Sequence, residues 1–352
     1  MDSLIHHLEG GQELSTREIE VAAEFLLEPS ASAEKKAHLL EALAAKGETP
    51  AEIAGFVETF LERAVNPHIH LLDLQGPTLD MCGTGGDHLN LFNVSTTAMF
   101  IAAAAGAVVV KHGNRGITSK SGGADVLEAL GIRLDLTTDE FRECIDKAGL
   151  GFLFAPAYHP AFKAVAEARK LLGQRKIRTI FNLIGPLLNP ARPECQLTGV
   201  FSRDLCPVFA DILQRLGRDS AWVVNGGTAD GRSVDEVSLM GPTRICKSGN
   251  YQDLEDEEIY PEDFGLALAS VDDLQGGDAR ENAVILENIL SGKEGGPKRD
   301  IVLLNAAAAL ACAGLSDHIG DGLDIARETI RDGSAMEKLR LLQKHSQSIH
   351  KA

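Results

Sequence analysis

The chain of 352 residues carries 34 Lys and Arg against 51 Asp and Glu, which gives a formal net charge of −17. Because a surface that coats nucleic acid or an anionic membrane needs a dominant positive field, this balance argues against both as partners. The length exceeds that of a usual single-core domain, so we expect two structural units.

The first 65 or so residues show the start signals and apolar spacing of helices. Ser15 and Glu18 form a capping box, and Thr49, Pro50 and Glu52 supply a second N-terminal cap with proline in the first turn. The sequence therefore predicts an all-helical N-terminal unit.

From residue 78 the pattern changes to short β-rich runs that alternate with glycine-rich turns and helical segments. This alternation is typical of an α/β domain with a central sheet flanked by helices. The predicted strands are 78–82, 107–111, 151–155, 196–201 and 221–225, and the predicted helices are 95–105, 124–130, 140–148, 161–172 and 205–216. The tail from residue 279 is again mostly helical, and we interpret the acidic run 253–258 as a solvated turn.

The six cysteines are scattered, without a CxxC pair or a Cys/His cluster that could hold zinc. We therefore expect reduced thiols and a cytoplasmic protein. The segment from Met1 to Leu8 lacks the basic and apolar parts of a secretory signal. The apolar stretches 98–110 and 301–315 are too short to span a bilayer.

One long segment contains no acid. From His88 through Ala124 there is no Asp or Glu, although 51 acids in 352 residues would place about five there. Lys111, Arg115 and Lys120 do occur in it. In an acidic protein such a segment is a candidate anion site.

Three loops in or beside this segment could bind a phosphate. The glycine-rich run 80–87 could offer backbone N–H groups to an anion, although a tight turn would explain it equally well. Asn93 and Ser95 open an apolar helix, where they could serve as caps or present free N–H groups to a phosphate. The run 111–123 holds three bases, a His, three hydroxyls and four glycines, which favours a binding loop over a plain surface loop.

Two further sites lie outside that segment. Asp235 and Glu236 are adjacent carboxylates, which are usually solvated but would suit Mg²⁺ if they faced the phosphate loops. Arg169 is either a surface charge or the partner of a substrate carboxylate.

These motifs occur in an order that resembles the anthranilate phosphoribosyltransferases, within the nucleoside phosphorylase and phosphoribosyltransferase family. The resemblance rests on the successive runs GTGGD, NVST, KHGNR, SKSG, FLFAPAYHPAFK, RTIFNLIGPLLNP, VDEVSL and RDIVLLNAAAAL. It implies a small helical domain over residues 1–75, joined by helices from about 168–190 and hinged to an α/β domain over 76–352. It also implies a homodimer formed through the helical domain.

The resemblance implies transfer of the 5-phosphoribosyl group from phosphoribosyl pyrophosphate to the amine of anthranilate in tryptophan biosynthesis, with two Mg²⁺ ions. Carried over by motif, the residues that bind phosphoribosyl pyrophosphate would be Gly83, Gly86, Asp87, Leu91, Asn93, Val94, Ser95, Thr96, Lys111, His112, Gly113, Asn114, Arg115, Gly116, Ile117, Thr118, Ser119 and Gly123. Those that bind anthranilate would be Gly83, Asn114 and Arg169. The metal ligands would be Ser95, Asp235 and Glu236, and the catalytic residues Lys111, His112 and Arg115.

The chain departs from the family pattern at several positions. Leu91 and Gly116 replace residues that usually carry a hydroxyl, Gly123 stands at a usual Ser or Ala, and Asn225 replaces a His. The segment 227–233 is longer than usual, and 174–176 resembles an insertion. These departures affect positioning and leave every charged member of the proposed set in place.

Two other functions remain open at this point. The first is a pyrimidine nucleoside phosphorylase, which shares the implied fold and is favoured by Gly116 and the Ser121–Asp125 run. The Lys111–Arg115 run and the Asp235–Glu236 pair favour the transferase. The second is a non-catalytic relative that binds nucleotide or nucleic acid, which the net charge of −17 disfavours.

Overall fold

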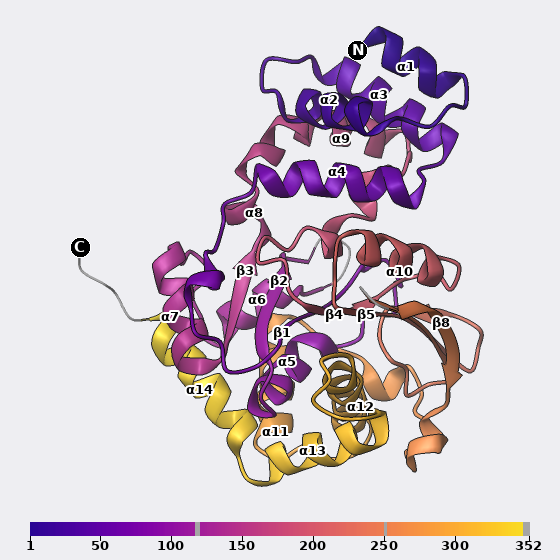
Figure 1. Ribbon diagram of the computed structural model, residues 1–352. Helices are drawn as coiled ribbons and strands as arrows, with labels where there is room; N and C mark the ends of the chain where they lie inside the picture. Colours follow the sequence, from indigo (N-terminus) through magenta and orange to yellow (C-terminus); the bar gives the residue numbers. More distant parts are fainter. Residues whose placement is uncertain (117–119, 250–251, 348–352) are drawn as a thin grey trace.

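The computed structural model describes residues 1–116, 120–249 and 252–347, and it consists of a helical unit placed above a larger α/β unit (Figure 1). This is the predicted fold class: a small all-helical unit and an α/β unit with a central sheet flanked by helices. The residue at which one unit ends and the other begins stays a prediction. Ile117, Thr118 and Ser119 lie outside the described residues.

The helical unit contains α1 (Asp2–Glu9), α2 (Thr16–Leu27), α3 (Ala33–Lys46) and α4 (Pro50–Glu62). Its predicted caps are present: the Ser15 N–H donates to Glu18 at 2.9 Å, and the Glu52 N–H donates to the Thr49 hydroxyl at 3.2 Å. A later segment, α9 (Ala166–Gln174), returns to this unit and packs on α3 (Figure 1). The chain therefore crosses between the two units more than once.

The central sheet has the order β3-β2-β1-β4-β5-β7-β8, with β6 paired to β5. Five strands run parallel: β1 (Thr78–Gly83), β2 (Val108–Gly113), β3 (Leu150–Phe154), β4 (Cys195–Gly199) and β5 (Ser220–Gly227). The antiparallel strands are β6 (Ser233–Val234), β7 (Thr243–Gly249) and β8 (Gln252–Ile259). Parallel strands place their carboxyl ends on one edge of the sheet, which is where ligands bind in such folds.

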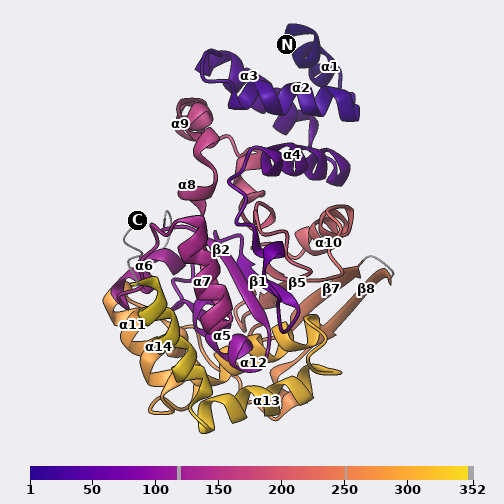
Figure 2. The same cartoon turned by 60° about the vertical axis from the view of Figure 1, so that its left-hand side comes forward.

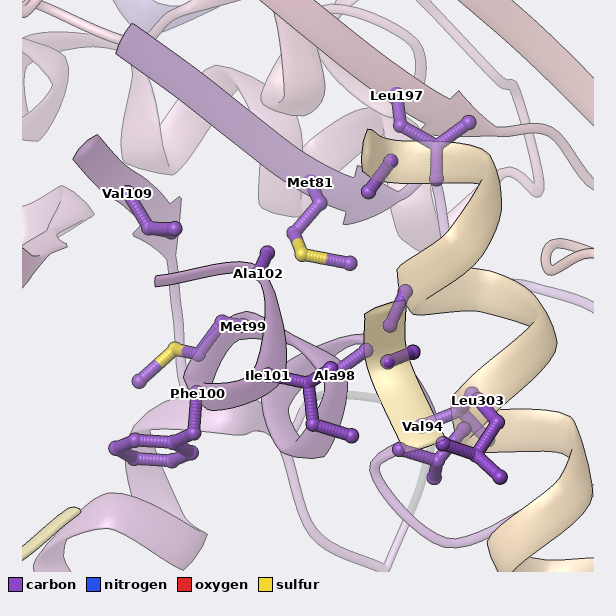
Figure 3. Close-up of a cluster of buried hydrophobic side chains, with 14 of the residues drawn as sticks. Met81, Val94, Ala98, Met99, Phe100, Ile101, Ala102, Val109, Leu197 and Leu303 are labelled. Atoms are coloured by element: carbon purple, nitrogen blue, oxygen red, sulfur yellow. The ribbon is translucent and has the colours of Figure 1, made fainter. Parts of the chain in front are cut away.

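Helices cover both faces of the sheet. One face is covered by α5 (Val94–Ala104), α6 (Gly123–Ala129), α11 (Ala279–Leu290), α12 (Pro297–Cys312), α13 (Ile319–Arg331) and α14 (Ser334–Ser346) (Figure 2). The close-up shows Val94 of α5 beside Leu303 of α12 within this buried cluster (Figure 3). On the opposite face, Phe141 and Ile145 of α7 (Thr138–Ala148) pack with Val108 and Val110 of β2. That face is also covered by α10 (Leu205–Arg215), which lies between the sheet and α4.

Alternation along β5 shows how the two cores are separated. Trp222 and Val224 point into the cluster with α5 and α12, whereas Ala221 and Val223 join α10 and the helical unit. Successive side chains on a strand face opposite sides of the sheet, so one strand serves both cores. The helical unit and α10 thus share one continuous apolar cluster.

The acidic run 253–258 is not a turn, and that prediction was wrong. It forms most of β8, the edge strand, and pairs with β7. Its carboxylates meet bases on the neighbouring strand, with Arg244 to Asp256 at 2.6 Å and Lys247 to Glu257 at 2.8 Å. Cross-strand ion pairs stabilise an exposed edge, and charge there blocks pairing with other chains.

Among the described helices, none combines the length and the apolar character needed to cross a bilayer.

Candidate active site

A cleft of about 660 Å³ lies at the carboxyl ends of β1 and β2, and two unlike walls enclose it. The glycine-loop wall is formed by residues 82–88, 90–93, 95–96, 111–116, 121–123 and 235–236, and the aromatic wall by those residues within 155–169 and 181–188 that line the same cleft. The cleft brings together most of the residues predicted from the sequence: Gly83, Gly86, Asp87, Leu91, Asn93, Ser95, Thr96, Lys111, His112, Gly113, Asn114, Arg115, Gly116, Gly123, Arg169, Asp235 and Glu236. Val94 does not line it, because its side chain is buried in the core.

The glycine loop after β1 holds Asp235, the first of the two carboxylates that the sequence predicts as metal ligands. The Gly85 N–H donates to Asp235 Oδ2 at 2.7 Å, and a Cβ at Gly83 would collide with the same carboxylate. Gly85 and Gly86 have φ values of 67° and 89°, a region that other residues seldom adopt. The glycines are therefore needed both for the turn and for the approach of Asp235.

The N-terminus of α5 holds the second carboxylate. The Ser95 N–H donates to Glu236 Oε1 at 3.2 Å, while the Val94 N–H is already used by the Phe92 carbonyl at 2.8 Å. Free N–H groups at a helix start favour negative charge. The side chain of Asn93 accepts from Asn282 at 2.9 Å, so this loop is also fixed from α11.

Asp235 and Glu236 fit a divalent cation. Burial, together with the negative charge of Asp87, raises the pKa of Asp235 to about 7, and burial together with Asp235 raises the pKa of Glu236 to about 8. A bound dication would relieve this crowding of charge. Within the described residues no group of three or more His, Cys, Asp or Glu could hold a metal alone. Mg²⁺ commonly takes one or two carboxylates and completes its shell with phosphate and water, which fits this pair.

Lys111 places a buried positive charge beside these carboxylates. Its side chain is 3% exposed, and its ammonium donates to the Met81 carbonyl and, at 3.3 Å, to the Ser95 hydroxyl. It lies in β2, which continues through Gly113 and so extends beyond the predicted strand end at residue 111. His112 and Gly113 are thus held by strand pairing rather than by a loop.

Arg115 has protein partners of its own. Its guanidinium pairs with Glu128, with Nη2 to Oε1 at 2.9 Å, and lies 5.2 Å from the centre of the Phe154 ring. Asp125 accepts from the N–H groups of Gly116 at 2.9 Å and Gly122 at 2.8 Å, which closes the loop on itself. Asp125 and Glu128 lie just beyond the end of the acid-free segment 88–124. The absence of acids within that segment therefore did not show that Arg115 has acidic partners.

His112 is a neutral group in the cleft. It is 5% exposed, its Nε2 has no hydrogen-bond partner among the described residues, and its ring lies 5.4 Å from that of His159. Burial, with His159 nearby, lowers its pKa to about 3. It can therefore donate or accept a hydrogen bond near pH 7 but adds no positive charge there.

The aromatic wall presents rings and a guanidinium. Phe162 and Phe181 pack edge to face with centroids 5.6 Å apart, and the Arg169 guanidinium lies 5.3 Å from the Phe181 ring centre. Arg169 forms no ion pair with any described residue, so its charge is available to a ligand carboxylate. Sequence reasoning missed Phe162, Phe181 and Leu188 as wall residues; their presence in the FLFAPAYHPAFK and RTIFNLIGPLLNP runs was the available signal.

Three departures from the family pattern have structural reasons. A Cβ at Gly123 would lie 2.9 Å from the Thr96 hydroxyl, so the glycine leaves room for it. The Leu91 side chain is partly buried and packs against the apolar cluster that contains α5 and α12. Asn225 is buried and donates to the Val200 carbonyl at 2.7 Å, which ties β5 to the end of β4.

The comparisons with known proteins agree with this geometry. Residues 75–336 match the glycosyl transferase family a/b domain, and residues 2–64 match the helical bundle domain of the same family. The chain is 43% identical to anthranilate phosphoribosyltransferase of Symbiobacterium thermophilum, over 100% of this chain and 98% of the relative. The chain belongs to the anthranilate phosphoribosyltransferase family. The relative from Pelodictyon phaeoclathratiforme is 42% identical, over 97% of this chain and 95% of its own.

Solved anthranilate phosphoribosyltransferases have the same fold. The enzyme from Thermus thermophilus superposes with a TM-score of 0.88 at 37% identity, over 98% of this chain and 99% of that one. The Saccharomyces cerevisiae enzyme in complex with phosphoribosyl pyrophosphate and Mg gives 0.84 at 27% identity, over 99% of both chains. The same yeast enzyme in complex with 4-fluoroanthranilate gives 0.82 at 26% identity, over 99% of both chains.

Proposed function

We propose that this chain transfers the 5-phosphoribosyl group of phosphoribosyl pyrophosphate to the amine of anthranilate, forming N-(5-phosphoribosyl)anthranilate and pyrophosphate. One observation carries the proposal: a single cleft sets two crowded carboxylates and Lys111 on one wall against an aromatic wall with the unpaired Arg169 on the other. The first wall suits a metal-bound pyrophosphate, and the second suits an aromatic carboxylate.

The difficult step is the departure of pyrophosphate from C1 of the ribose. As that bond breaks, negative charge grows on the leaving oxygen and positive charge grows on the sugar. The buried ammonium of Lys111 is already held by the Met81 carbonyl and the Ser95 hydroxyl, so it would stabilise the leaving group without reorganisation. Mg²⁺, held by Asp235, Glu236 and Ser95, would supply further charge neutralisation for the pyrophosphate.

The acceptor needs little activation, because an aromatic amine is already neutral near pH 7. Arg169 would bind the anthranilate carboxylate, with Phe162 and Phe181 as apolar surface for the ring. Asn114 and Gly83 lie on the opposite side of the cleft, where they would contact the acceptor near C1. His112, being neutral, would contribute a hydrogen bond and no charge.

Arg115 receives a smaller role than the resemblance implied. Because Glu128 and Asp125 neutralise its guanidinium, we assign it to holding the shape of the phosphate loop. Lys111 would then carry the contact with phosphate on this side of the cleft. Support for the substrates comes from the yeast relative, which was solved with phosphoribosyl pyrophosphate and Mg and with 4-fluoroanthranilate.

The decisive assay mixes the chain with anthranilate, phosphoribosyl pyrophosphate and Mg²⁺ and follows the loss of anthranilate fluorescence. Loss that requires all three supports the proposal. Absence of loss together with phosphorolysis of uridine or thymidine would assign the chain to the phosphorylases instead. Salt-sensitive binding of single-stranded DNA by an inactive chain would favour the non-catalytic alternative.

The proposal extends to assembly and location. Two Mg²⁺ ions, a homodimer formed through the helical unit, and a cytoplasmic location follow from the same family resemblance. The described cysteines are all free thiols, which agrees with a reducing compartment, and Val21 of α2 is an exposed apolar side chain on the helical unit. Sedimentation velocity of the chain and of its Val21→Asp variant would test the dimer.

A further inference from the structure

Asn305 is a polar residue in an otherwise apolar helix. It lies in α12, where residues 301–310 are all buried and its neighbours are Ile, Val, Leu and Ala. Its side chain is 0% exposed. Burial of an amide is costly unless its hydrogen bonds are made, so its partners indicate why it is there.

Those partners lie directly beside the metal-site carboxylates. The Val237 N–H donates to Asn305 Oδ1 at 2.9 Å, and Asn305 Nδ2 donates to the Val237 carbonyl at 2.8 Å. The second Nδ2 hydrogen reaches the Ile301 carbonyl at 2.9 Å. Both amide hydrogens and the amide oxygen thus have a partner, and two of the three bonds go to the residue that follows Glu236.

The backbone at Val237 needs such a partner because the sheet ends just before it. The β5–β6 ladder pairs only Gly226 with Val234 and Gly227 with Ser233. Val237 is buried beyond that ladder, so without Asn305 its N–H and carbonyl would have no partner among the bonds described here. Gly226 lets the chain pass closely here, since a Cβ at that position would lie 2.6 Å from the Glu236 carbonyl.

The same helix also positions α5. Leu303 of α12 belongs to the buried cluster that contains Val94 and Ala98 of α5 (Figure 3). The Ser95 N–H, next to Val94, is the donor to Glu236. The helix α12 therefore packs against the start of α5, which carries the Ser95 N–H, and also bonds to Val237, which follows the acceptor Glu236.

We infer that Asn305 is a positioning residue for the magnesium site: by clamping both backbone groups of Val237 it sets Asp235 and Glu236 against the glycine loop and the start of α5. It touches no substrate and acts through Val237. The inference rests on the proposed function, and it extends it to a residue on the far side of the sheet edge from the cleft.

The test compares Asn305→Ala with Leu310→Ala, a matched control that also removes a buried side chain of α12 but bonds to nothing near Val237. Binding of Mn²⁺ to the chain with phosphoribosyl pyrophosphate is measured by electron paramagnetic resonance, alongside the melting temperature and the two Michaelis constants. We expect Asn305→Ala to weaken Mn²⁺ binding by about 10- to 100-fold, as removal of an outer-shell partner does. The KM for anthranilate should stay unchanged, and Leu310→Ala should lower only the melting temperature.

A second variant guards against loss of folding. Asn305→Gln keeps an amide donor and acceptor for Val237 on a side chain one methylene longer and adds no buried charge, so we expect a smaller loss of Mn²⁺ affinity. The inference is overturned if a folded Asn305 variant binds Mn²⁺ normally, or if it loses no more Mn²⁺ affinity than Leu310→Ala does. Failure of both Asn305 variants to fold would also overturn it. If the unaltered chain binds Mn²⁺ but consumes no anthranilate, the proposed function fails while the Mn²⁺ measurement still tests Asn305.

Discussion

The two walls of the cleft bind by different means. The glycine-loop wall uses backbone N–H groups and buried charges that already bond to one another, such as Gly85 with Asp235 and Ser95 with Glu236. The aromatic wall uses ring surfaces and the unpaired Arg169. Preorganised dipoles and buried charge stabilise a changing charge distribution, whereas exposed side chains mainly select a ligand. We therefore expect substitutions in the glycine-loop wall to lower kcat. Substitutions in the aromatic wall should raise the KM for anthranilate.

The largest effect should come from Asp235→Ala combined with Glu236→Ala. Loss of one preorganised electrostatic group costs about 100-fold or more, so the double variant should lose at least about 1,000-fold of Mg²⁺-dependent kcat. Asp230→Ala, in the exposed turn just upstream, is the control and should retain activity. Near-normal turnover in the double variant would move the metal to another part of the cleft.

Lys111→Met should reduce kcat by about 100-fold, because it removes the buried ammonium that we propose stabilises the leaving group. The KM for anthranilate should change little, since Lys111 lies on the opposite wall. Steady-state kinetics with each substrate varied in turn measures both constants. Lys147→Met, an exposed lysine paired with Asp146, serves as the control. A purely KM effect would contradict the assignment of Lys111 to the departing charge.

Arg169→Ala tests the other wall. A hydrogen-bonded ion pair with a carboxylate contributes about 1.5–3 kcal/mol, which corresponds to a rise of about 10- to 100-fold in the KM for anthranilate. The KM for phosphoribosyl pyrophosphate should stay near its original value. Lys170→Ala removes the adjacent cation, which pairs with Glu167 and does not line the cleft. Equal changes in both Michaelis constants would refute the division between the walls.

The smallest effect concerns stability and His112. Burial lowers its pKa to about 3 from the ordinary 6.5, so between these values the unfolded chain binds a proton that the folded chain does not. The free energy of unfolding should then rise with pH across this window, by at most about 1.4 kcal/mol per pH unit from this group, and fall as the pH drops. His112→Asn should show a shallower slope in denaturant unfolding from pH 4 to 7. The exposed His6→Gln serves as the control, and a slope unchanged in His112→Asn would rule out this contribution.

Local patterns in the sequence predicted a large part of the fold and the cleft. Capping boxes such as Ser15 with Glu18 predicted helix starts, because the bonds involved span only three residues. The glycine and hydroxyl loops were predicted for the same reason, and the metal-site pair Asp235–Glu236 stands adjacent in the chain.

The rest depends on contacts between distant parts of the chain. The acidic run 253–258 became a strand because β7 supplies bases opposite it, and no local signal shows that partner. From the sequence, Arg115 was expected to face phosphate. In the structure it pairs with Glu128 of α6, and the sequence did not show that pairing. Asn305 is 68 residues from Val237, so the bonds that explain its burial are invisible to any periodicity of α12.

The apolar cluster that joins the helical unit to α10 and to Ala221 and Val223 of β5 has a consequence for cooperativity. Although residues 2–64 and 75–336 match separate family models, the first region covers apolar surface that α10 would otherwise expose to water. Excision of the helical unit would leave that surface bare, which favours aggregation. The two regions should therefore melt in one transition rather than as independent units.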